Sequence, residues 1–355
     1  MLSVFVPRGS TLERIPVAPG EPPPDAAVWI DLVSPTVQED KLVEQMLGIA
    51  VPTREEMQEI EVSSRLYVEN GARYMTATLM CQSDTPAPKT TAVTFILSNH
   101  RLATVRYDDP RPFVIVEHKL ARACPPKVSG DSVLMDLLDA VIDRSADILE
   151  RIGGEVDQVS RAIFEPEDEP GPPSYNDILR QLGRKGDLTS KVRESLVSIG
   201  RVLSFLANEA EGMRWTKDVR AQLMSMQRDV ISLSDHATYL ANKITFLLDA
   251  MLGVVNLQQN NIIKIFSVAA VVLMPPTLVA SIYGINFRHM PELDWHFGYP
   301  IALVLMPPTL VASIYGMNFK HMPELDFDFG YPMAIVIMIA AAIGPILFFK
   351  WKKWL

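Results

Sequence analysis

The residues best suited to handling ions form a stripe through a long apolar stretch late in the sequence. Alternating steps of four and three from Asp249 meet mostly small or polar side chains, although leucine, valine, isoleucine and phenylalanine surround them. Such steps follow one face of an α-helix. The stripe comprises Asp249, Gly253, Asn256, Asn260, Ile263, Ser267, Ala270, Met274, Thr277, Ser281 and Gly284. The seam of a soluble coiled coil would carry leucine and isoleucine at these positions instead.

Two interpretations of the stripe compete. Small residues allow membrane helices to pack closely, which is the first. The second is that the stripe faces water, because polar groups at membrane depth are costly unless they line a cavity or bind one another. One helix cannot enclose a cavity, whereas several copies around a symmetry axis can. A cyclic homo-oligomer with the stripe facing inward would be a pore, in which Ile263, Ala270 and Met274 form apolar rings able to gate by dewetting.

The elements that must position this stripe include three apolar runs, at 262–283, 299–315 and 331–349. The first run contains one charge, Lys264, and the other two contain none. A hydrocarbon core of about 30 Å needs roughly 20 helical residues, so the middle run is borderline. The first run continues a helix that starts near Thr216 and should extend to Tyr283, with a kink expected at Pro275-Pro276. A helix of that length is predicted to join a coiled-coil stalk to a membrane helix.

Ahead of these runs, the pattern predicts a cytoplasmic α/β domain over 1–128 and a cytoplasmic helical stalk over 129–261, with the transmembrane region over 262–355. Strands are expected at 27–33, 66–68, 74–80, 91–97 and 102–107, and helices at 36–47, from 53, at 129–164 and at 176–207. Thr36 with Glu39, and Thr53 with Glu56, have the spacing of a helix capping box. The acidic, proline-rich segment 165–173 is expected to be a solvated loop, with cation binding as the alternative.

Composition and motifs exclude several classes of protein. The net charge of −9 argues against nucleic acid as a partner and is compatible with a protein that handles cations. The sequence has no CxxC or HExxH zinc motif, no Walker loop and no GxSxG elbow, so we expect no cofactor and no enzyme activity. Cys81 and Cys124 are expected to be reduced, buried thiols. The N-terminus lacks the pattern of a signal peptide, which predicts a cytoplasmic location for the first 250 residues.

A specific motif occurs where the long helix should end. Tyr283-Gly-Ile-Asn-Phe287 is followed by Met290-Pro-Glu-Leu293, and Tyr315-Gly-Met-Asn-Phe319 is followed by Met322-Pro-Glu-Leu325. This pattern resembles the CorA family of divalent-cation channels, whose mark is YGMNF followed by MPEL. The resemblance covers nearly the whole chain. It includes Trp29-Ile-Asp-Leu32, Met274-Pro-Pro-Thr277, the Phe-Gly-Tyr-Pro before the last run and the basic end from Lys350 to Leu355.

The resemblance implies an α+β cytoplasmic funnel, a long stalk helix that continues as the pore helix, one further span, and a homopentamer in a lipid bilayer. It places the selectivity filter at Gly284, Ile285, Asn286, Gly316, Met317 and Asn318. The metal ion would be contacted there through Asn286 or Asn318. It also places Asp249, Asn260, Met274 and Thr277 in the pore, and the stripe already contains these four. A regulatory Mg²⁺ site is implied between cytoplasmic domains, with Asp229 close to where one carboxylate is expected.

The chemistry of these residues suits Mg²⁺, which holds its water shell tightly. Neutral asparagine carbonyls can accept hydrogen bonds from a hydrated ion without stripping it, whereas a carboxylate ring would release the ion more slowly. The acidic residues Glu292, Asp294, Glu324 and Asp326 either concentrate cations at the pore mouth or are ordinary loop charges. Ile285 departs from the family pattern, so a Zn²⁺ transporter of the same superfamily is an alternative, as is a non-conducting membrane-anchored coiled-coil scaffold.

The motif is doubled because a 32-residue unit is repeated. The segments 273–304 and 305–336 match at 26 of 32 positions. The six differences lie at positions 285, 288, 295, 296, 301 and 303 of the first copy. Removing either unit leaves a normal family tail, which is the pattern of an in-frame tandem duplication. Two copies of a helix-loop-helix fragment stack no core, so this is no solenoid. The duplication is interpreted as recent or as an error in the sequence, and a functional second filter is the weaker alternative.

The repeat produces a conflict in topology. The basic tail at Lys350–Lys353 favours a cytoplasmic C-terminus, which requires an even number of spans in a multi-pass protein of the bacterial inner membrane. The middle run is the shortest and has Pro307-Pro308 at its centre, so the first and third runs are predicted to cross. Both motifs would then lie outside. The alternative is three spans with the tail outside.

Overall fold

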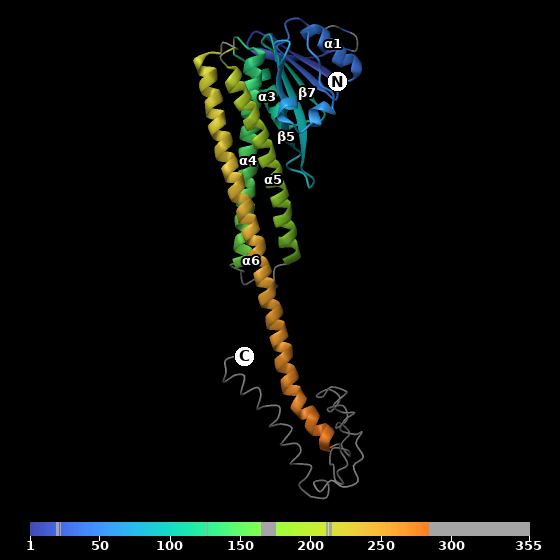
Figure 1. Ribbon diagram of the computed structural model, residues 1–355, viewed down its shortest axis with the longest axis vertical. Helices are drawn as coiled ribbons and strands as arrows, with labels where there is room; N and C mark the ends of the chain where they lie inside the picture. The colour runs from blue at the N-terminus through green and yellow to red at the C-terminus, as the bar shows by residue number, and fades with distance from the viewer. Residues whose placement is uncertain are drawn as a thin grey trace. The chain divides into compact units, whose positions relative to one another are not determined.

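The computed structural model describes residues 1–18, 21, 23–125, 127–164, 175–210, 212 and 215–283, of which 272, 273 and 275–283 are described by their backbone alone. Two compact units meet between Met251 and Leu252. The first unit, Met1–Met251, contains a sheet and a set of long helices (Figure 1).

The sheet of the first unit has seven strands in the described residues, in the order β2-β1-β3-β7-β6-β5-β4. Their bounds are β1 Leu2–Arg8, β2 Thr11–Pro16, β3 Trp29–Val33, β4 Leu66–Glu69, β5 Ala72–Cys81, β6 Lys89–Ser98 and β7 Arg101–Arg106. All neighbouring strands are antiparallel except β3 and β7, which are parallel. The five predicted strands are thus confirmed, and the N-terminal hairpin of β1 and β2 is an addition.

Two of the hairpin turns are formed by residue types that favour a tight reversal of the chain. Asn70 and Gly71 join β4 to β5 with φ of 51° and 79°, and Asn99 and His100 join β6 to β7 with φ of 48° and 61°. Positive φ at both central residues is the geometry that matches the twist of two-residue hairpins, and asparagine and glycine adopt it at low cost. The second turn also contacts α4, because the backbone N–H of Gly130 donates to the carbonyl of His100 at 2.6 Å.

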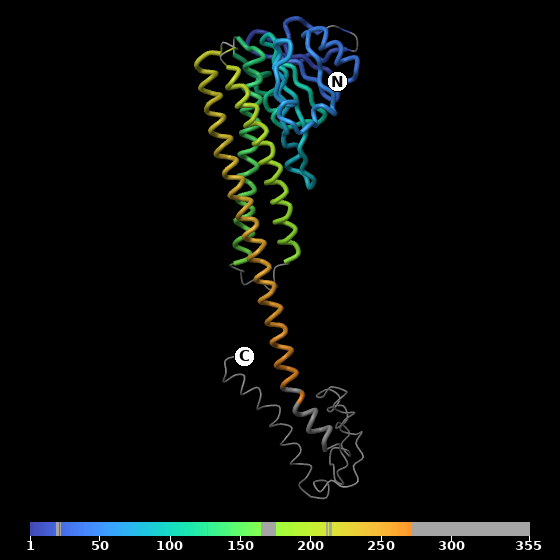
Figure 2. The backbone as a smooth tube through the Cα atoms, in the orientation of Figure 1, coloured from blue at the N-terminus to red at the C-terminus, as the bar shows by residue number. Residues whose placement is uncertain are grey.

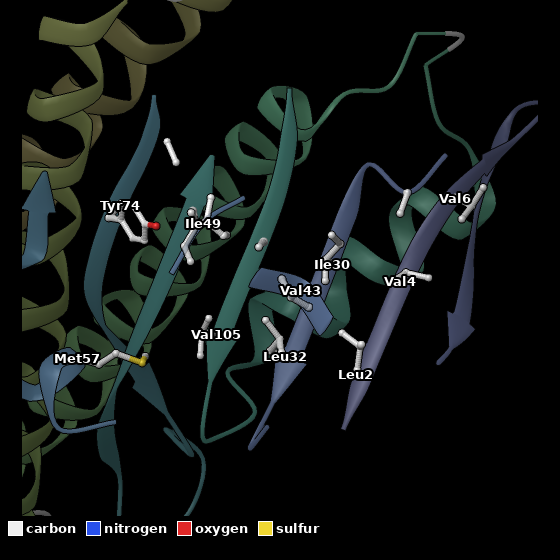
Figure 3. Close-up of a cluster of buried hydrophobic side chains, with 14 residues drawn as sticks. Leu2, Val4, Val6, Ile30, Leu32, Val43, Ile49, Met57, Tyr74 and Val105 are labelled. Carbon is white, nitrogen blue, oxygen red and sulfur yellow. The ribbon is translucent and has the colours of Figure 1, made fainter. Parts of the chain in front are cut away.

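One face of the sheet is covered by α1 (Val37–Leu47), which begins at the predicted capping box of Thr36 and Glu39. Figure 3 shows Val43 of α1 within a buried apolar cluster that includes Ile30 and Leu32 of β3. The second predicted capping box also forms, since Thr53 and Glu56 exchange hydrogen bonds of 2.8 and 3.3 Å. The sequence predicted a helix after this capping box, and that prediction is wrong in the length of the helix. Only a 3-10 turn, η1 (Glu56–Gln58), follows, and α2 (Val62–Arg65) is a single turn.

The other face carries a buried network beneath α3 (Arg111–Arg122). Phe5 stacks on Trp29 with ring centroids 4.0 Å apart, and the Trp29 Nε1–H donates to Thr104 Oγ1 at 2.9 Å. Thr104 in turn donates to Asp31 Oδ1 at 2.7 Å, and Arg106 pairs with Asp31 at 2.9 Å. Trp29 and Asp31, two residues of the family-like Trp-Ile-Asp-Leu segment, therefore organise the sheet.

Three long helices complete the first unit, and the two predicted before the stalk are confirmed as α4 (Gly130–Phe164) and α5 (Tyr175–Glu209). The third is α6, whose first part packs beside them (Figure 2). Leu240 and Ile244 of α6 pack over Gly153 and Gly186, at 3.8 and 3.7 Å from where a Cβ would stand, which is ordinary van der Waals contact. Lys243 of α6 also pairs with Asp157 of α4.

Candidate ion pathway along helix α6

Helix α6 spans Lys217–Tyr283, so the long helix predicted from near Thr216 to Tyr283 is confirmed. Thr216 caps its start, since its hydroxyl accepts from the backbone N–H of Val219 at 3.4 Å and its carbonyl accepts from Arg220 at 3.2 Å. The backbone is helical through Pro275-Pro276. The predicted stripe therefore lies on continuous helical backbone from Asp249 to Ser281.

Steps of three and four along a helix return to one side of it, so the stripe forms a single face of α6. Asp249, Gly253, Asn256, Asn260, Ser267 and Ala270 are exposed in the single chain. The side chains that would form apolar rings are exposed too, with Ile263 at 61% and Met274 at 69%. Thr277 and Ser281 take helical positions on the same face, and Gly284 lies outside the described residues. The structure thus brings the candidates onto one face rather than into a closed pocket.

One feature of this face was missed by the sequence interpretation. Gln258, Gln259 and Asn261 neighbour Asn260, and all are exposed. Amides therefore surround α6 at this level instead of occupying the stripe alone. The signal was present as the uninterrupted run Gln-Gln-Asn-Asn, which no apolar residue divides. An amide on every side of a helix is costly in hydrocarbon, so this level of α6 is better suited to water than to lipid.

Past the amide band the exposed surface of α6 is mostly apolar, although Lys264 and Ser267 are exposed there too. Ile262, Ile265 and Phe266 are 53%, 65% and 72% exposed. Among the described helices, one segment, Lys217–Val271, is long and apolar enough to cross a membrane, judged by length and composition alone. Exposed isoleucine and phenylalanine on several sides of one helix require cover by lipid or by another helix.

Comparison with known proteins decides the family. The family model described as CorA-like Mg²⁺ transporter protein matches residues 24–306 and 301–351. The chain belongs to this family.

Three similar proteins show how close the likeness is. The CorA-like chain is 33% identical over 357 residues to the magnesium transport protein CorA of Escherichia coli (strain K12), with all of both chains covered. Its fold matches the complete structure of the CorA magnesium transporter from Methanocaldococcus jannaschii, with a TM-score of 0.68, 15% identity and coverage of 100% of this chain and 99% of that one. The ZntB cytoplasmic domain from Vibrio parahaemolyticus matches 72% of this chain and 97% of its own length at a TM-score of 0.53 and 9% identity, which shows a shared fold alone. The family is one of transporters, not enzymes.

The carboxylate implied near a regulatory metal site, Asp229, is exposed on α6 of this CorA-like chain. Its charge acts on Asp139 of α4, where burial and the charges of Asp143, Asp136 and Asp229 raise the pKa. Lys119 opposes this shift and pairs with Asp136 at 2.8 Å. Within the described residues no group of three or more acidic, histidine or cysteine side chains is placed to hold a metal ion. The carboxylates therefore make a negative patch rather than a complete metal site in one chain.

The remaining candidates lie outside the described residues. They are the filter residues Gly284, Ile285, Asn286, Gly316, Met317 and Asn318, the acidic residues Glu292, Asp294, Glu324 and Asp326, the second and third apolar runs, and the loop at 165–173. Cys81 and Cys124 are described and are free, buried thiols, as predicted. Burial, with the charge of Asp108, raises the pKa of the Cys81 thiol.

Proposed function

We propose that this chain carries Mg²⁺ into the cell as a homo-oligomeric membrane channel. The observation that carries the proposal is the family match along the chain, together with 33% identity over its whole length to a protein named for magnesium transport. The placement of the polar stripe on one exposed face of α6 supports it, because copies of that face around an axis would line a water-filled path. A divalent ion entering along the membrane potential gains about 4.6 kcal/mol per 100 mV, twice the single-charge value.

The ion path proposed here uses α6 as the pore lining and an asparagine ring as the filter. Asn256, Asn260 and Thr277 offer amide and hydroxyl oxygens that can hydrogen-bond to a hydrated ion. Asn286 or Asn318 would do the same at the outer mouth without displacing the tightly held water of Mg²⁺. The acidic residues that follow the filter would raise the local cation concentration there.

Growth of a strain that lacks its own magnesium transporters tests the function. Expression of this chain should restore growth at limiting Mg²⁺, and radioisotope or dye-based flux in liposomes should be faster for Mg²⁺ than for Zn²⁺, with Co²⁺ and Ni²⁺ compared in parallel. Growth no better than with empty vector, at confirmed membrane expression, would favour the non-conducting scaffold. Faster Zn²⁺ flux would favour the zinc alternative, which the magnesium-named relatives do not support.

The assembly is proposed to be a homopentamer, as the family resemblance implies. Support comes from α6 in the first unit, where Met224, Ile231, Tyr239 and Phe246 follow one another by seven, eight and seven residues. They are 57%, 63%, 56% and 60% exposed in the single chain. Large apolar side chains at a heptad-like spacing on a solvated helix indicate a surface that another helix covers.

The 32-residue repeat is proposed to be a tandem duplication with one working filter. The two segments that match the family model overlap at 301–306, and this overlap contains the joint at Leu305-Met306. A family tail that is interrupted and then resumed would give such an overlap. Residues 273–304 are joined directly to the preceding part of α6, so the first copy is the proposed filter.

The chain is proposed to lie in the inner membrane with both ends cytoplasmic and with the first and third runs crossing. Cys81→Ser with Cys124→Ser gives a background for single cysteines at Lys320→Cys and Lys353→Cys. A membrane-impermeant thiol reagent should label intact cells at position 320 and leave position 353 protected, because the basic tail is held inside. Labelling at 353 from outside would instead indicate three spans.

Mg²⁺ is also proposed to act as a regulatory ion at the negative patch of Asp136, Asp139, Asp143 and Asp229. One chain does not complete a metal site there, so a neighbouring copy would supply further ligands. A bound cation would relieve the repulsion that raises the pKa of Asp139.

Mg²⁺ should therefore raise the melting temperature of the purified protein, and Asp139→Asn with Asp143→Asn should remove most of that rise. A protein is destabilised as pH rises through the raised folded-state pKa of such a carboxyl, because deprotonation places a negative charge in a buried and already negative site. Cation binding compensates this loss, so the effect of Mg²⁺ should be larger above the pKa of Asp139 and smaller below it. Thermal scans at several pH values check both statements, and an equal Mg²⁺ effect in the double variant would contradict them.

A further inference from the structure

A hollow in the first unit has no role in the proposed transport. It lies between α2, the strands β5 and β6, and α5, in two adjoining parts of about 250 and 520 Å³ that share Arg65, Thr78 and Glu194. No residue of α6 lines it among those described. We call it the basic hollow, because four arginines line it: Arg54, Arg65, Arg193 and Arg201.

The positive charge of the basic hollow is not neutralised within the described part of the chain. None of the four arginines forms an ion pair with a described carboxylate. The two acids in the lining are Asp108 and Glu194, and Asp108 already pairs with Lys89 at 2.5 Å. The lining therefore contains four arginines and one carboxylate, Glu194, that form no ion pair within the described residues. This is a local excess of positive charge in a chain whose net charge is −9.

Hydrogen-bond donors are fixed in the wall of the basic hollow. Arg65 donates to the Thr78 hydroxyl at 3.0 Å and also to the backbone carbonyl of Glu59, which holds its planar fork in place. Ser198 accepts from the backbone N–H of Thr78 at 2.8 Å. Since the Thr78 and Ser198 oxygens act as acceptors in these bonds, each hydroxyl keeps its own hydrogen to donate.

An aromatic ring borders the smaller part. The guanidinium carbon of Arg54 lies over the Tyr107 ring, 5.1 Å from its centroid. The larger part adds the exposed Arg193 and Arg201, two turns apart on α5. The larger part, at about 520 Å³, is by itself within the range of roughly 300–1,000 Å³ found for small-molecule sites.

We propose that the basic hollow binds a small phosphate-bearing anion. Guanidinium groups bind phosphate through parallel N–H···O bonds and keep their charge at all physiological pH values, which makes arginine the residue of choice for this anion. The hydroxyl groups of Thr78 and Ser198 can donate hydrogen bonds to the remaining phosphate oxygens. The same chemistry is offered by free phosphate and by a polyphosphate such as a nucleotide, and the excess of three positive charges favours the polyphosphate.

Binding to the full-length protein in detergent tests the proposal, with inorganic phosphate, pyrophosphate and metal-free ATP as probes in calorimetric titrations at low salt. We expect saturable binding that weakens as salt is added. Arg193→Gln with Arg201→Gln should weaken it at least tenfold while leaving the Arg65–Thr78 bond in place. Arg65→Gln should weaken it as well.

The matched control is Arg180→Gln, on the same helix and exposed, about 20 Å along the axis from Arg193 at 1.5 Å per residue. It should bind as the unchanged protein does. Tighter binding of pyrophosphate and ATP than of phosphate identifies a polyphosphate site, and equal binding identifies a site for the single oxyanion. The proposal is overturned if no probe binds, or if the arginine pair can be replaced without loss of affinity. If no probe binds and the oligomer also dissociates in the Arg193→Gln, Arg201→Gln variant, the proposal is overturned. The hollow would then bind an acidic side chain of a neighbouring copy.

Discussion

Asn286→Ala is expected to abolish Mg²⁺ uptake, whereas Asn318→Ala should reduce it only mildly. The first copy of the motif begins at Tyr283, the last residue of α6, so Asn286 is only three residues from the proposed pore helix. The second copy comes after Phe297-Gly-Tyr-Pro300, and the glycine and proline of that segment are expected to interrupt any helix continuing from the stalk. Loss of a neutral carbonyl ring would remove the hydrogen bonds that admit the hydrated ion.

The repeat supplies its own control for this experiment. The two asparagines stand in segments that match at 26 of 32 positions, so the same substitution is compared in nearly the same local sequence. Uptake is measured in the transporter-deficient strain at equal membrane expression. A stronger effect of Asn318→Ala would show that the second motif forms the pore mouth, and equal loss in both would show that each is required.

The long helices could be predicted because each signal is local and repeated. Apolar residues recur at three and four from Val133 to Ile152, and α4 ends at Phe164 as expected. The same holds for α5 and α6, whose ends are within two residues of their predicted positions. The capping box of Thr36 and Glu39 could be predicted as well, since its hydrogen bonds join two residues only three positions apart, although Glu39 also pairs with the amino group of Met1.

What was missed depends on partners far away in the sequence. β1 is a short apolar run containing Pro7, and it pairs on one side with its hairpin partner β2 and on the other with β3, a strand distant in the sequence. α3 contains Val114-Ile-Val116, which locally favours a strand, yet Phe113 and Val116 are buried against the sheet and α4. Thr53 and Glu56 form their capping bonds, but Met57 is drawn into the apolar cluster and the chain then turns toward β4.

The two candidate sites differ in the same way, since one could be found from the sequence and the other could not. The stripe on α6 was found from sequence because one helix carries all of it, so spacing alone places its members on one face. The basic hollow was not found, because Arg54, Arg65 and Arg193 come from three elements that only the fold brings together. No spacing in the sequence relates them.

The buried pair of Asp31 and Arg106 gives the largest effect expected on stability. Asp31 and Arg106 are 4% and 8% exposed, and Arg106 contacts both carboxylate oxygens. Burial alone would lower the pKa of Arg106, but the hydrogen bonds and charges of Asp31 and Asp109 outweigh it and raise that pKa. The Arg106 guanidinium also lies over the ring of Phe113, 4.7 Å from its centroid.

Arg106→Met should therefore destabilise the first unit by about 3–5 kcal/mol, because it leaves the Asp31 carboxylate buried without its cation. Removing both charges should cost less, so Asp31→Leu with Arg106→Met is expected to recover part of the loss, although Thr104 then loses its acceptor. Arg8→Met is the control, since the Arg8–Glu13 pair is exposed and surface changes fall within about 0.5 kcal/mol.

Denaturant unfolding of the full-length protein in detergent, followed by far-UV circular dichroism, measures these differences. The decisive quantity is the order of the three variants. If Arg106→Met lost no more stability than Arg8→Met, the buried pair would contribute little to the stability of the sheet. If the double variant lost more than Arg106→Met, the hydrogen bond from Thr104 to Asp31 would be the contact that matters, and the arginine would serve mainly to neutralise the carboxylate that accepts it.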